Sequence, residues 1–320
     1  MNDIRRTILW VIFGFSMVML WDQWQVYNGR KATFFPSPTQ TATQSVAPAN
    51  PASAANSVPT ATTSAAGSVQ LPGATSTSAP QAGASVAHER VVAQTDVLKV
   101  TFDTEGGSLV RAEFLAHIDM ADKTRRFVLL DDSKDRVYLA QSGLIAGAGG
   151  VALPTHKSVM TLAPGELILK DGSQNLELRF ESAEVGGVKL VKTYTLTRGS
   201  YAIAVKHEVV NVGAAAVAPQ LYLQLVRDGN KPPGESSFYS TFTGPAVYTD
   251  AKKYQKVEFA DIEKNKVDIE KTADNGYVAM VQHYFASAWI LGNGVKRDLF
   301  MRKVDTNLYS VGMIAPLEAI

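Results

Sequence analysis

The chain has 320 residues, with 31 basic and 30 acidic side chains, and it contains no cysteine. This balance of charge gives no basic face for a nucleic acid, and the lack of cysteine excludes disulfides, cysteine-ligated zinc, iron–sulfur clusters and thiol catalysis. The hydrophobic fraction of 46% permits a sizeable core.

Residues 1–28 are predicted to form a membrane anchor. The run Ile8–Leu20 carries no charge and is rich in large apolar residues. It is shorter than the ~20 residues that cross a bilayer, but its flanks extend it to a span of about residues 7–27. These flanks are Thr7 and an aromatic-rich stretch, Trp21–Tyr27, whose Trp and Tyr rings suit the headgroup level.

The orientation of this anchor follows from Arg5 and Arg6, which precede the apolar run. The positive-inside rule predicts a cytoplasmic N-terminus and translocation of residues 28–320. A cleavable signal peptide is the main alternative, but bulky and polar residues follow the run where small ones would be needed. A buried soluble helix is disfavoured because the run is apolar on all faces.

Residues 29–88 are predicted to be a disordered linker. From Ala32 to Ala87 there is no Asp, Glu, Lys or Arg, and the composition is dominated by Ala, Ser, Thr, Pro, Gln and Gly. Such a stretch buries too little apolar surface to offset the entropy of ordering its backbone. Its mean reach would be roughly 40 Å, so the linker acts as a spacer.

Residues 89–320 are predicted to form one mainly β domain, a large antiparallel β-sandwich. Four stretches alternate apolar and polar residues with a period of two, which places one face on a core and the other towards water. These stretches are Leu98–Phe102, Leu176–Glu181, Tyr201–Val209 and Leu221–Leu225. Glycine-containing turns separate them.

Two further local features are predicted within this domain. Leu176–Phe180 and Val188–Leu196, with Gly186 and Gly187 between them, form a hairpin. Asp261–Glu270 is polar and fits either a short helix or a loop.

The five histidines do not form a recognisable site. None of His88, His117, His156, His207 and His283 pairs with another at metal-ligand spacing. His207 and Glu208 are neighbours in a strand and so point to opposite faces, which prevents them from acting together on one substrate. His207 lies on the apolar face, which favours a structural role over a catalytic one. His283 has aromatic neighbours that would suit a sugar pocket, but a core strand is the simpler interpretation.

Other signals for chemistry are weak. The sequence has no serine-hydrolase elbow and no glycine-rich nucleotide-binding loop. Asp131 and Asp132 are expected to be solvated in a polar turn, and Lys252, Lys253 and Lys256 form only a small basic patch. We therefore expect no catalytic residue, no cofactor, no metal and no nucleic acid.

Several segments of the chain nevertheless carry distinctive motifs. They are Arg5–Ser16 with Leu20–Asp22, Lys192–Tyr201 with Val209–Asn211, Phe242–Tyr248, Lys253–Phe259 and Gly276–Trp289. The first resembles the N-terminal anchor, and the others resemble the periplasmic domain, of one known family, the YidC membrane-protein insertases of Gram-negative bacteria.

The resemblance implies a mutarotase-like supersandwich in the periplasm, anchored in the bacterial inner membrane and without enzyme activity. It also implies a role in inserting and folding inner-membrane proteins, with the Sec translocon, its accessory subunits and nascent membrane proteins as partners. After the N-terminal run, the chain reaches Met313–Ile320 without a further apolar run of spanning length. The chain is therefore expected to be a fragment or a truncated product that supplies an anchor and a docking module.

Two other functions fit the same sequence. A sugar-binding or mutarotase-like enzyme would bring His207 or His283 together with a carboxylate in a pocket. A plain envelope scaffold would share the topology and leave the matched motifs unexplained.

Overall fold

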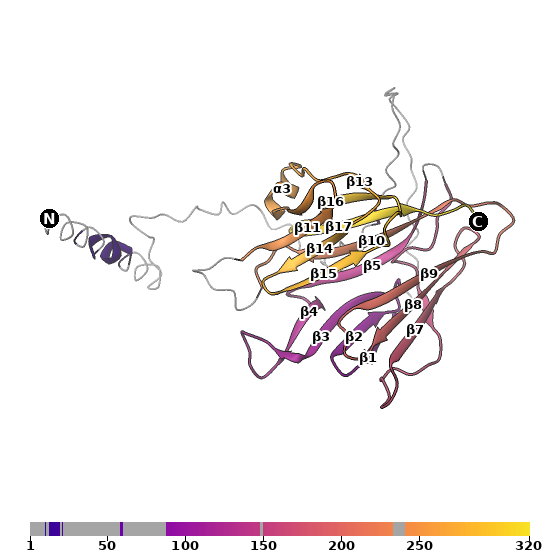
Figure 1. Cartoon of the computed structure of the whole chain (residues 1–320), viewed down its shortest axis with the longest axis horizontal. Helices are drawn as coiled ribbons and strands as arrows, with labels where there is room; N and C mark the ends of the chain where they lie inside the picture. The colour runs from indigo at the N-terminus through magenta and orange to yellow at the C-terminus, as the bar shows by residue number, and fades with distance from the viewer. Residues whose placement is uncertain are drawn as a thin grey trace, which may run out of the picture. The chain divides into compact units, whose positions relative to one another are not determined.

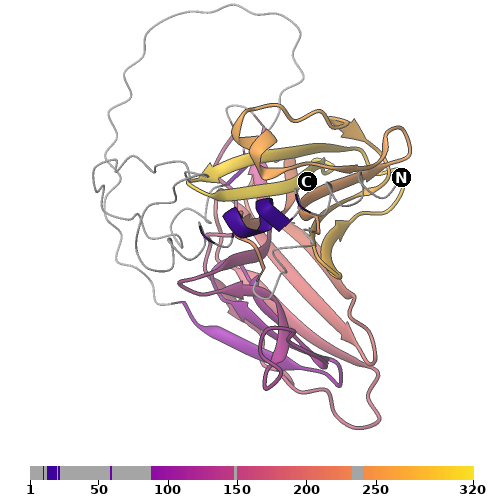
Figure 2. The same ribbon diagram turned by 90° about the vertical axis from the view of Figure 1, so that its left-hand side faces the viewer.

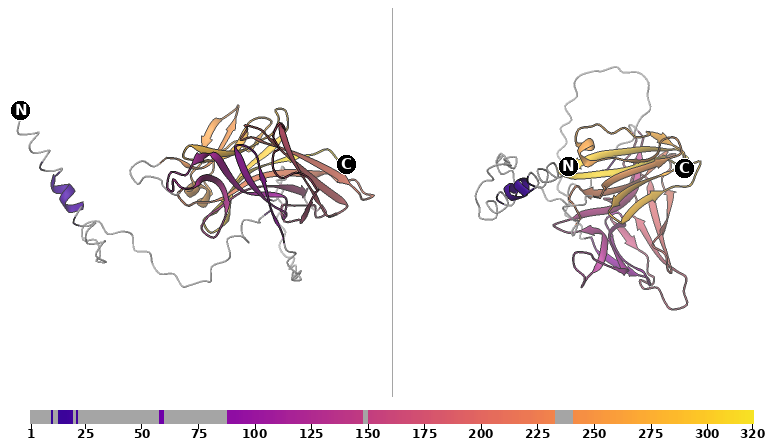
Figure 3. Two further views of the ribbon diagram at one scale, coloured as in Figure 1. Left: turned by 90° about the horizontal axis from the view of Figure 1, so that it is seen from below. Right: turned by 60° about the vertical axis from the view of Figure 1, so that its left-hand side comes forward.

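The computed structural model describes residues 10, 13–19, 21, 58–59, 88–147, 150–232 and 241–320. In the N-terminal unit, residues 13–19 are helical (Figure 3). Most of these residues are exposed. Among the described residues, no helix is both long enough and apolar enough to cross a membrane. Most of the predicted anchor over 7–27 and of the predicted linker over 29–88 lies outside the described residues.

The described part of the predicted β domain is built mainly of antiparallel sheets, as the alternating segments indicated. The largest sheet has nine strands. In spatial order they are β1 (Arg90–Gln94), β2 (Leu98–Asp103), β3 (Ser108–Ile118), β4 (Arg126–Asp132), β5 (Val137–Ala146), β10 (Pro219–Asp228), β17 (Leu308–Pro316), β16 (Arg297–Asp305) and β13 (Thr272–Ala273).

Two smaller sheets have four strands each. The first is, in spatial order, β6 (Met160–Leu162), β7 (Asn175–Ser182), β8 (Val188–Thr197) and β9 (Ile203–Asn211). The second is β12 (Lys253–Lys256), β11 (Thr243–Thr249), β14 (Tyr277–Gln282) and β15 (Phe285–Ile290). Strands β9 and β15 are therefore edge strands of their respective sheets.

Both small sheets pack on the same face of the nine-stranded sheet, and one hydrophobic cluster joins all three. The first small sheet covers β1–β3, where the Phe102 ring lies 5.6 Å from Phe180 and 4.6 Å from Tyr194. The second covers β5 and β10, where the Tyr138 hydroxyl donates to the Met280 carbonyl at 3.0 Å. Figures 1 and 2 show these two groups of strands diverging from each other.

Strand β10 differs from its sequence-based prediction. The alternation in Leu221–Leu225 predicted that Tyr222 and Gln224 face water, but both are fully buried. Tyr222 packs with Ile145 and Ile314 in a second cluster on the opposite face of the sheet. The reason is that β10 is a central strand covered on both faces, so its polar side chains must find partners inside the protein.

The local predictions are mostly confirmed. Strands β7 and β8 form the predicted hairpin, and Gly186 and Gly187 have φ values of +63° and +78°, which favour glycine. The segment 261–270 begins within a short helix, α3 (Phe259–Glu263), and continues without regular structure.

The predicted polar turn at Asp131 and Asp132 is wrong. Both residues end strand β4, where they form ion pairs with Arg111 and Arg90 respectively. In a sequence, carboxylates that end a strand and form ion pairs look the same as solvated turn residues, because each kind follows an apolar run.

Candidate functional site

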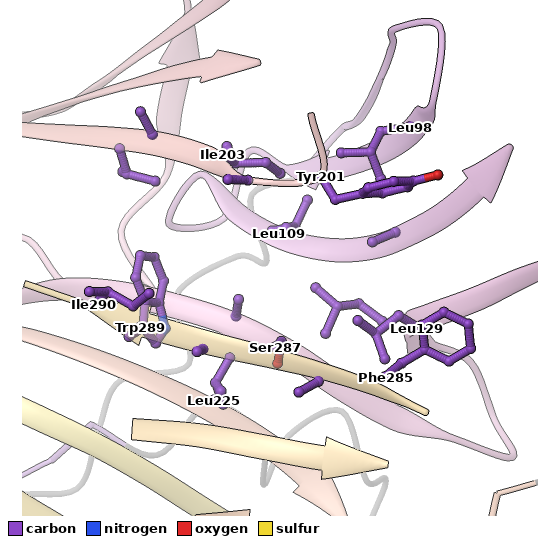
Figure 4. A pocket seen from close by; sticks show the side chains of 18 of the residues that line it. Leu98, Leu109, Leu129, Tyr201, Ile203, Leu225, Phe285, Ser287, Trp289 and Ile290 are labelled. Carbon is purple, nitrogen blue, oxygen red and sulfur yellow. The ribbon is translucent and has the colours of Figure 1, made fainter. Parts of the chain in front are cut away.

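A cleft of about 730 Å³ separates the two small sheets. One wall is β9 with the residues that precede it, and the other wall is β15 (Figure 4). Strands β3, β4, β5 and β10 of the nine-stranded sheet also contribute lining residues. The cleft therefore lies between two edge strands, and the nine-stranded sheet forms its floor.

The walls follow from the period-two pattern of their strands. In β15, Phe285, Ser287 and Trp289 are half-buried, while the alanines between them are exposed. In the other wall, Ile203 and Val205 are half-buried, and their neighbours Ala202 and Ala204 are exposed. Small side chains thus leave the backbones of both edges accessible.

An aromatic cluster joins the two walls at one end of the cleft. Phe285 of β15 stacks on Phe127 of β4, with ring centroids 3.9 Å apart. Phe114 of β3 lies 5.5 Å from Phe285 and 4.9 Å from Tyr201, which precedes β9. Such ring pairs add stability beyond the area that they bury, so this end of the cleft is preformed.

Hydrogen bonds fix the β15 wall on the central sheet. The Tyr138 hydroxyl lies 2.6 Å from the Ser287 hydroxyl, and the Trp289 indole N–H donates to the Gln224 carbonyl at 3.0 Å. Burial raises the pKa of Tyr138, so the phenol stays neutral. The wall is thus held by neutral groups rather than by ion pairs.

His207 lies in the cleft wall, partly buried, as its place on the apolar face predicted. Its Nε2 is 2.8 Å from the Ser142 hydroxyl, and Lys192 is its cross-strand partner in β8. Burial, with a smaller contribution from the Lys192 charge, lowers the pKa of His207 to about 3. The imidazole is therefore neutral, and its hydrogen-bond partner is a hydroxyl rather than a carboxylate.

Lys192 is a fully buried residue that sequence reasoning missed. Its ammonium donates to the carbonyls of Gly106 at 2.6 Å and Ser142 at 2.7 Å. Burial lowers its pKa to about 7. Lysine in an alternating strand is usually a surface residue. The only sequence signal for the burial of Lys192 is its position between Leu190 and Tyr194 on the apolar face of the strand.

Among the described residues, no hydrogen bond or ring contact joins His207 to another histidine, although His117 lines the same cleft. His283 sits in the turn between β14 and β15, with φ of +50°, and its Nδ1 is 2.7 Å from the Thr241 hydroxyl. His88 pairs with Asp103 at 2.9 Å.

His117 contacts Tyr201 near the aromatic end of the cleft, and His156 is buried against Tyr222. In the part of the chain that the structure describes, no cluster of His, Cys, Asp or Glu could hold a metal ion.

The charge of the cleft distinguishes it from a sugar-converting site. Its 25 lining residues include no Asp, Glu, Lys or Arg. The histidine–carboxylate pair that the enzyme hypothesis requires is not formed there by any described residue. An apolar cleft between accessible strand edges can instead bind an extended apolar segment through backbone hydrogen bonds and side-chain burial.

The basic patch of Lys252, Lys253 and Lys256 is also taken up by local contacts. Lys252 pairs with Asp268 at 2.8 Å, and the Lys256 ammonium lies 5.1 Å from the Phe242 ring centroid. Lys253 begins β12 with φ of +59°. These contacts stabilise the β11–β12 turn region.

Comparison with known proteins gives a consistent family. Residues 90–320 match the YidC periplasmic domain. The chain is 47% identical over 323 residues to the membrane protein insertase YidC of Janthinobacterium sp. (strain Marseille), covering 99% of this chain and 55% of that protein. It is 48% identical over 318 residues to the same-named protein of Cupriavidus necator, covering 98% and 54%. The chain thus spans about half the length of these curated relatives.

Solved structures show a more distant likeness. A galactose mutarotase related enzyme from Lactobacillus acidophilus has 10% identity and a TM-score of 0.43, covering 71% of this chain and 85% of that one. A galactose mutarotase-like protein from Lactobacillus casei has 10% identity and a TM-score of 0.39, covering 71% and 87%.

Proposed function

Because the chain belongs to the YidC family of membrane-protein insertases, which are not enzymes, we propose that it supplies the anchor and periplasmic docking module of such an insertase. We further propose that the cleft between β9 and β15 receives extended apolar segments of nascent inner-membrane proteins. Contacts with the Sec translocon and its accessory subunits are part of the same proposal, at surfaces outside the cleft.

The observation that carries this proposal is the uncharged cleft between two unpaired strand edges. Charged residues and proline are the usual devices that prevent an edge strand from pairing. Strand β15 has neither over Phe285–Ile290. At its mouth, Tyr284 and Ile290 are 73% and 70% exposed. Such an edge gains both hydrogen bonds and apolar burial when a further strand is added.

The proposed topology supports this role. Arg5 and Arg6 before the apolar run favour an anchor with a cytoplasmic N-terminus, which would place the cleft in the periplasm. Segments of a membrane protein that emerge there are apolar and lack backbone partners, so a neutral cleft with free strand edges suits them.

Site-specific photocrosslinking tests the proposal in the full-length protein in its native membrane. We expect a photoreactive phenylalanine analogue at Ala288 in the cleft to crosslink a ribosome-bound nascent inner-membrane protein. The same analogue at Glu177, an exposed residue of β7 outside the cleft lining, provides the matched control. Equal crosslinking from both positions, or none from position 288, would refute the docking role.

A charge in the cleft should weaken docking without harming the fold. Ala288→Asp places a carboxylate at an exposed edge position, and burying that charge against an apolar segment should reduce crosslinking from a second cleft site about tenfold. Ala183→Asp, at an exposed alanine beyond β7, should leave crosslinking unchanged.

A further inference from the structure

Two residues of the predicted linker lie against the β domain. The Val58 carbonyl accepts a hydrogen bond from Arg302 Nη1 at 3.2 Å. The Val58 side chain is partly buried and packs with Ile145, Tyr222 and Ile314. Pro59 is buried. This contact joins residues 244 positions apart in the chain, so it is tertiary rather than local.

The site that receives Val58 is shaped by the central sheet. Phe300 of β16 is part of the same cluster and lies over Gly312 of β17, where a Cβ would come within 2.4 Å of its ring and 2.5 Å of the Leu223 carbonyl. Only glycine at this position leaves room for the ring. The Arg302 guanidinium lies 5.6 Å from the centroid of the same ring, which orients its donor towards Val58.

The neighbouring polar residues help to hold Arg302 in place. Its Nη2 lies 3.5 Å from Gln224 Oε1, which also accepts a hydrogen bond from the Ser310 hydroxyl at 3.2 Å. Gln224 in turn donates to Gln141 at 2.9 Å. Buried and hydrogen-bonded polar groups of this kind have few alternative positions, so the donor for Val58 is preorganised.

The Val58 site is on the opposite face of the sheet from the cleft. Tyr222 and Ile314 are paired across β10 and β17 and belong to the cluster that contains Val58. Their neighbours Leu221 and Leu223 belong instead to the core that faces the two small sheets, because successive side chains of a strand alternate. A segment bound at this site therefore does not compete with a ligand in the cleft.

The dipeptide itself is suited to such a role. Proline fixes its own φ and restricts the preceding residue to extended conformations, so Val58–Pro59 loses less conformational entropy on binding than linker residues without a neighbouring proline would. Val58 also supplies one of the few large apolar side chains in a stretch of small and polar residues.

We propose that Val58–Pro59 is a second attachment point that fixes the linker to the outer face of the nine-stranded sheet within the same molecule. The spacer between the anchor and the domain would then be residues 29–57 rather than 29–88. The mean reach of a flexible chain scales with the square root of its length, so it falls from roughly 40 Å to roughly 30 Å. The linker contact thus limits how far the domain and its cleft extend from the membrane.

Spin labelling of the full chain tests this proposal directly, because the protein has no native cysteine. A nitroxide at Thr60→Cys should give a slow-motion spectrum, and one at Thr75→Cys a fast spectrum. Val58→Asp should remove the slow component at position 60, since the carboxylate would lose its hydration against Ile145 and Ile314, where the Val58 side chain packs. Leu71→Asp makes the same kind of change at another linker residue followed by proline, and it should leave the slow component intact.

Two results would overturn the proposal. The first is a label at position 60 that moves as fast as the one at position 75 in the otherwise unchanged linker. The second is a slow component that falls when the total protein concentration is lowered, which would mean that the site is filled by a second copy of the chain. Because Val58 lies outside every strand, Val58→Asp should leave the circular dichroism of the β domain unchanged.

Discussion

The buried ammonium of Lys192 should make the stability of the β domain rise with pH. Lys192 has no exposed surface, and burial lowers its pKa from 10.5 to about 7. In the unfolded chain the amine keeps its ordinary pKa, so between pH 7 and 10.5 the unfolded state binds more protons than the folded state. The free energy of unfolding therefore increases with pH through this window.

The magnitude follows from the two pKa values. Integrated from pH 7 to 9.5, this single group contributes an increase of about 3 kcal/mol to the free energy of unfolding. The window ends there because burial raises the pKa of Tyr138, Tyr194 and Tyr222. Above about pH 10 their ionisation in the unfolded state opposes folding.

Urea unfolding of the full chain in detergent, followed by circular dichroism at pH 7 and 9.5, measures this increase. Lys192→Met should abolish most of it, whatever the variant's stability at pH 7, because the titrating group is gone. Lys189→Met, on the same strand but paired with Glu181 at the surface, should retain it. An equal rise in wild type and Lys192→Met would refute the reasoning.

Three further predictions concern the cleft and its supports. Phe285→Ala removes the ring that stacks on Phe127 and should lower the free energy of unfolding in urea by about 2 kcal/mol. Gly276→Ala should lower the free energy of unfolding by about 3 kcal/mol, because φ is +84° and the new Cβ would lie 1.9 Å from a carbonyl oxygen of β11. Gly294→Ala has the same φ and open space around it, so a thermal melt should show a smaller loss of about 1 kcal/mol. The depressed pKa of His207 predicts that stability falls as pH drops below 6.5, where the unfolded imidazole takes up a proton first, and His207→Gln should reduce this fall. Equal losses in the two glycine variants, or an unchanged acid response in His207→Gln, would contradict these assignments.

Much of the fold could be predicted from local pattern. The alternation in Leu176–Glu181 and the two glycines after it define the β7–β8 hairpin, because one face of that hairpin is buried and the other is exposed to solvent. The same rule failed for Leu221–Leu225, since β10 is covered on both faces and Tyr222 and Gln224 are satisfied by distant partners. Burial of a polar side chain depends on those partners, which local sequence does not contain.

The cleft could be predicted only in part. The aromatic neighbours of His283 suggested either a pocket or a core strand, and the choice between the two depended on strand order. Strand β15 lines a cleft because it ends its sheet opposite β9. That arrangement arises from pairings between segments far apart in the chain, as does the contact between Val58 and Arg302.

Hydrogen exchange of the edge strands gives the most direct test of the docking role. Strands β15 and β12 are the two edges of one sheet, so they form a matched pair within the same molecule. If an extended apolar segment adds to the cleft, the amides of Phe285–Ile290 should exchange more slowly in the presence of a nascent membrane-protein segment, while those of Lys253–Lys256 stay unchanged. Unchanged exchange in β15, or equal slowing of both edges, would contradict the docking role of the cleft.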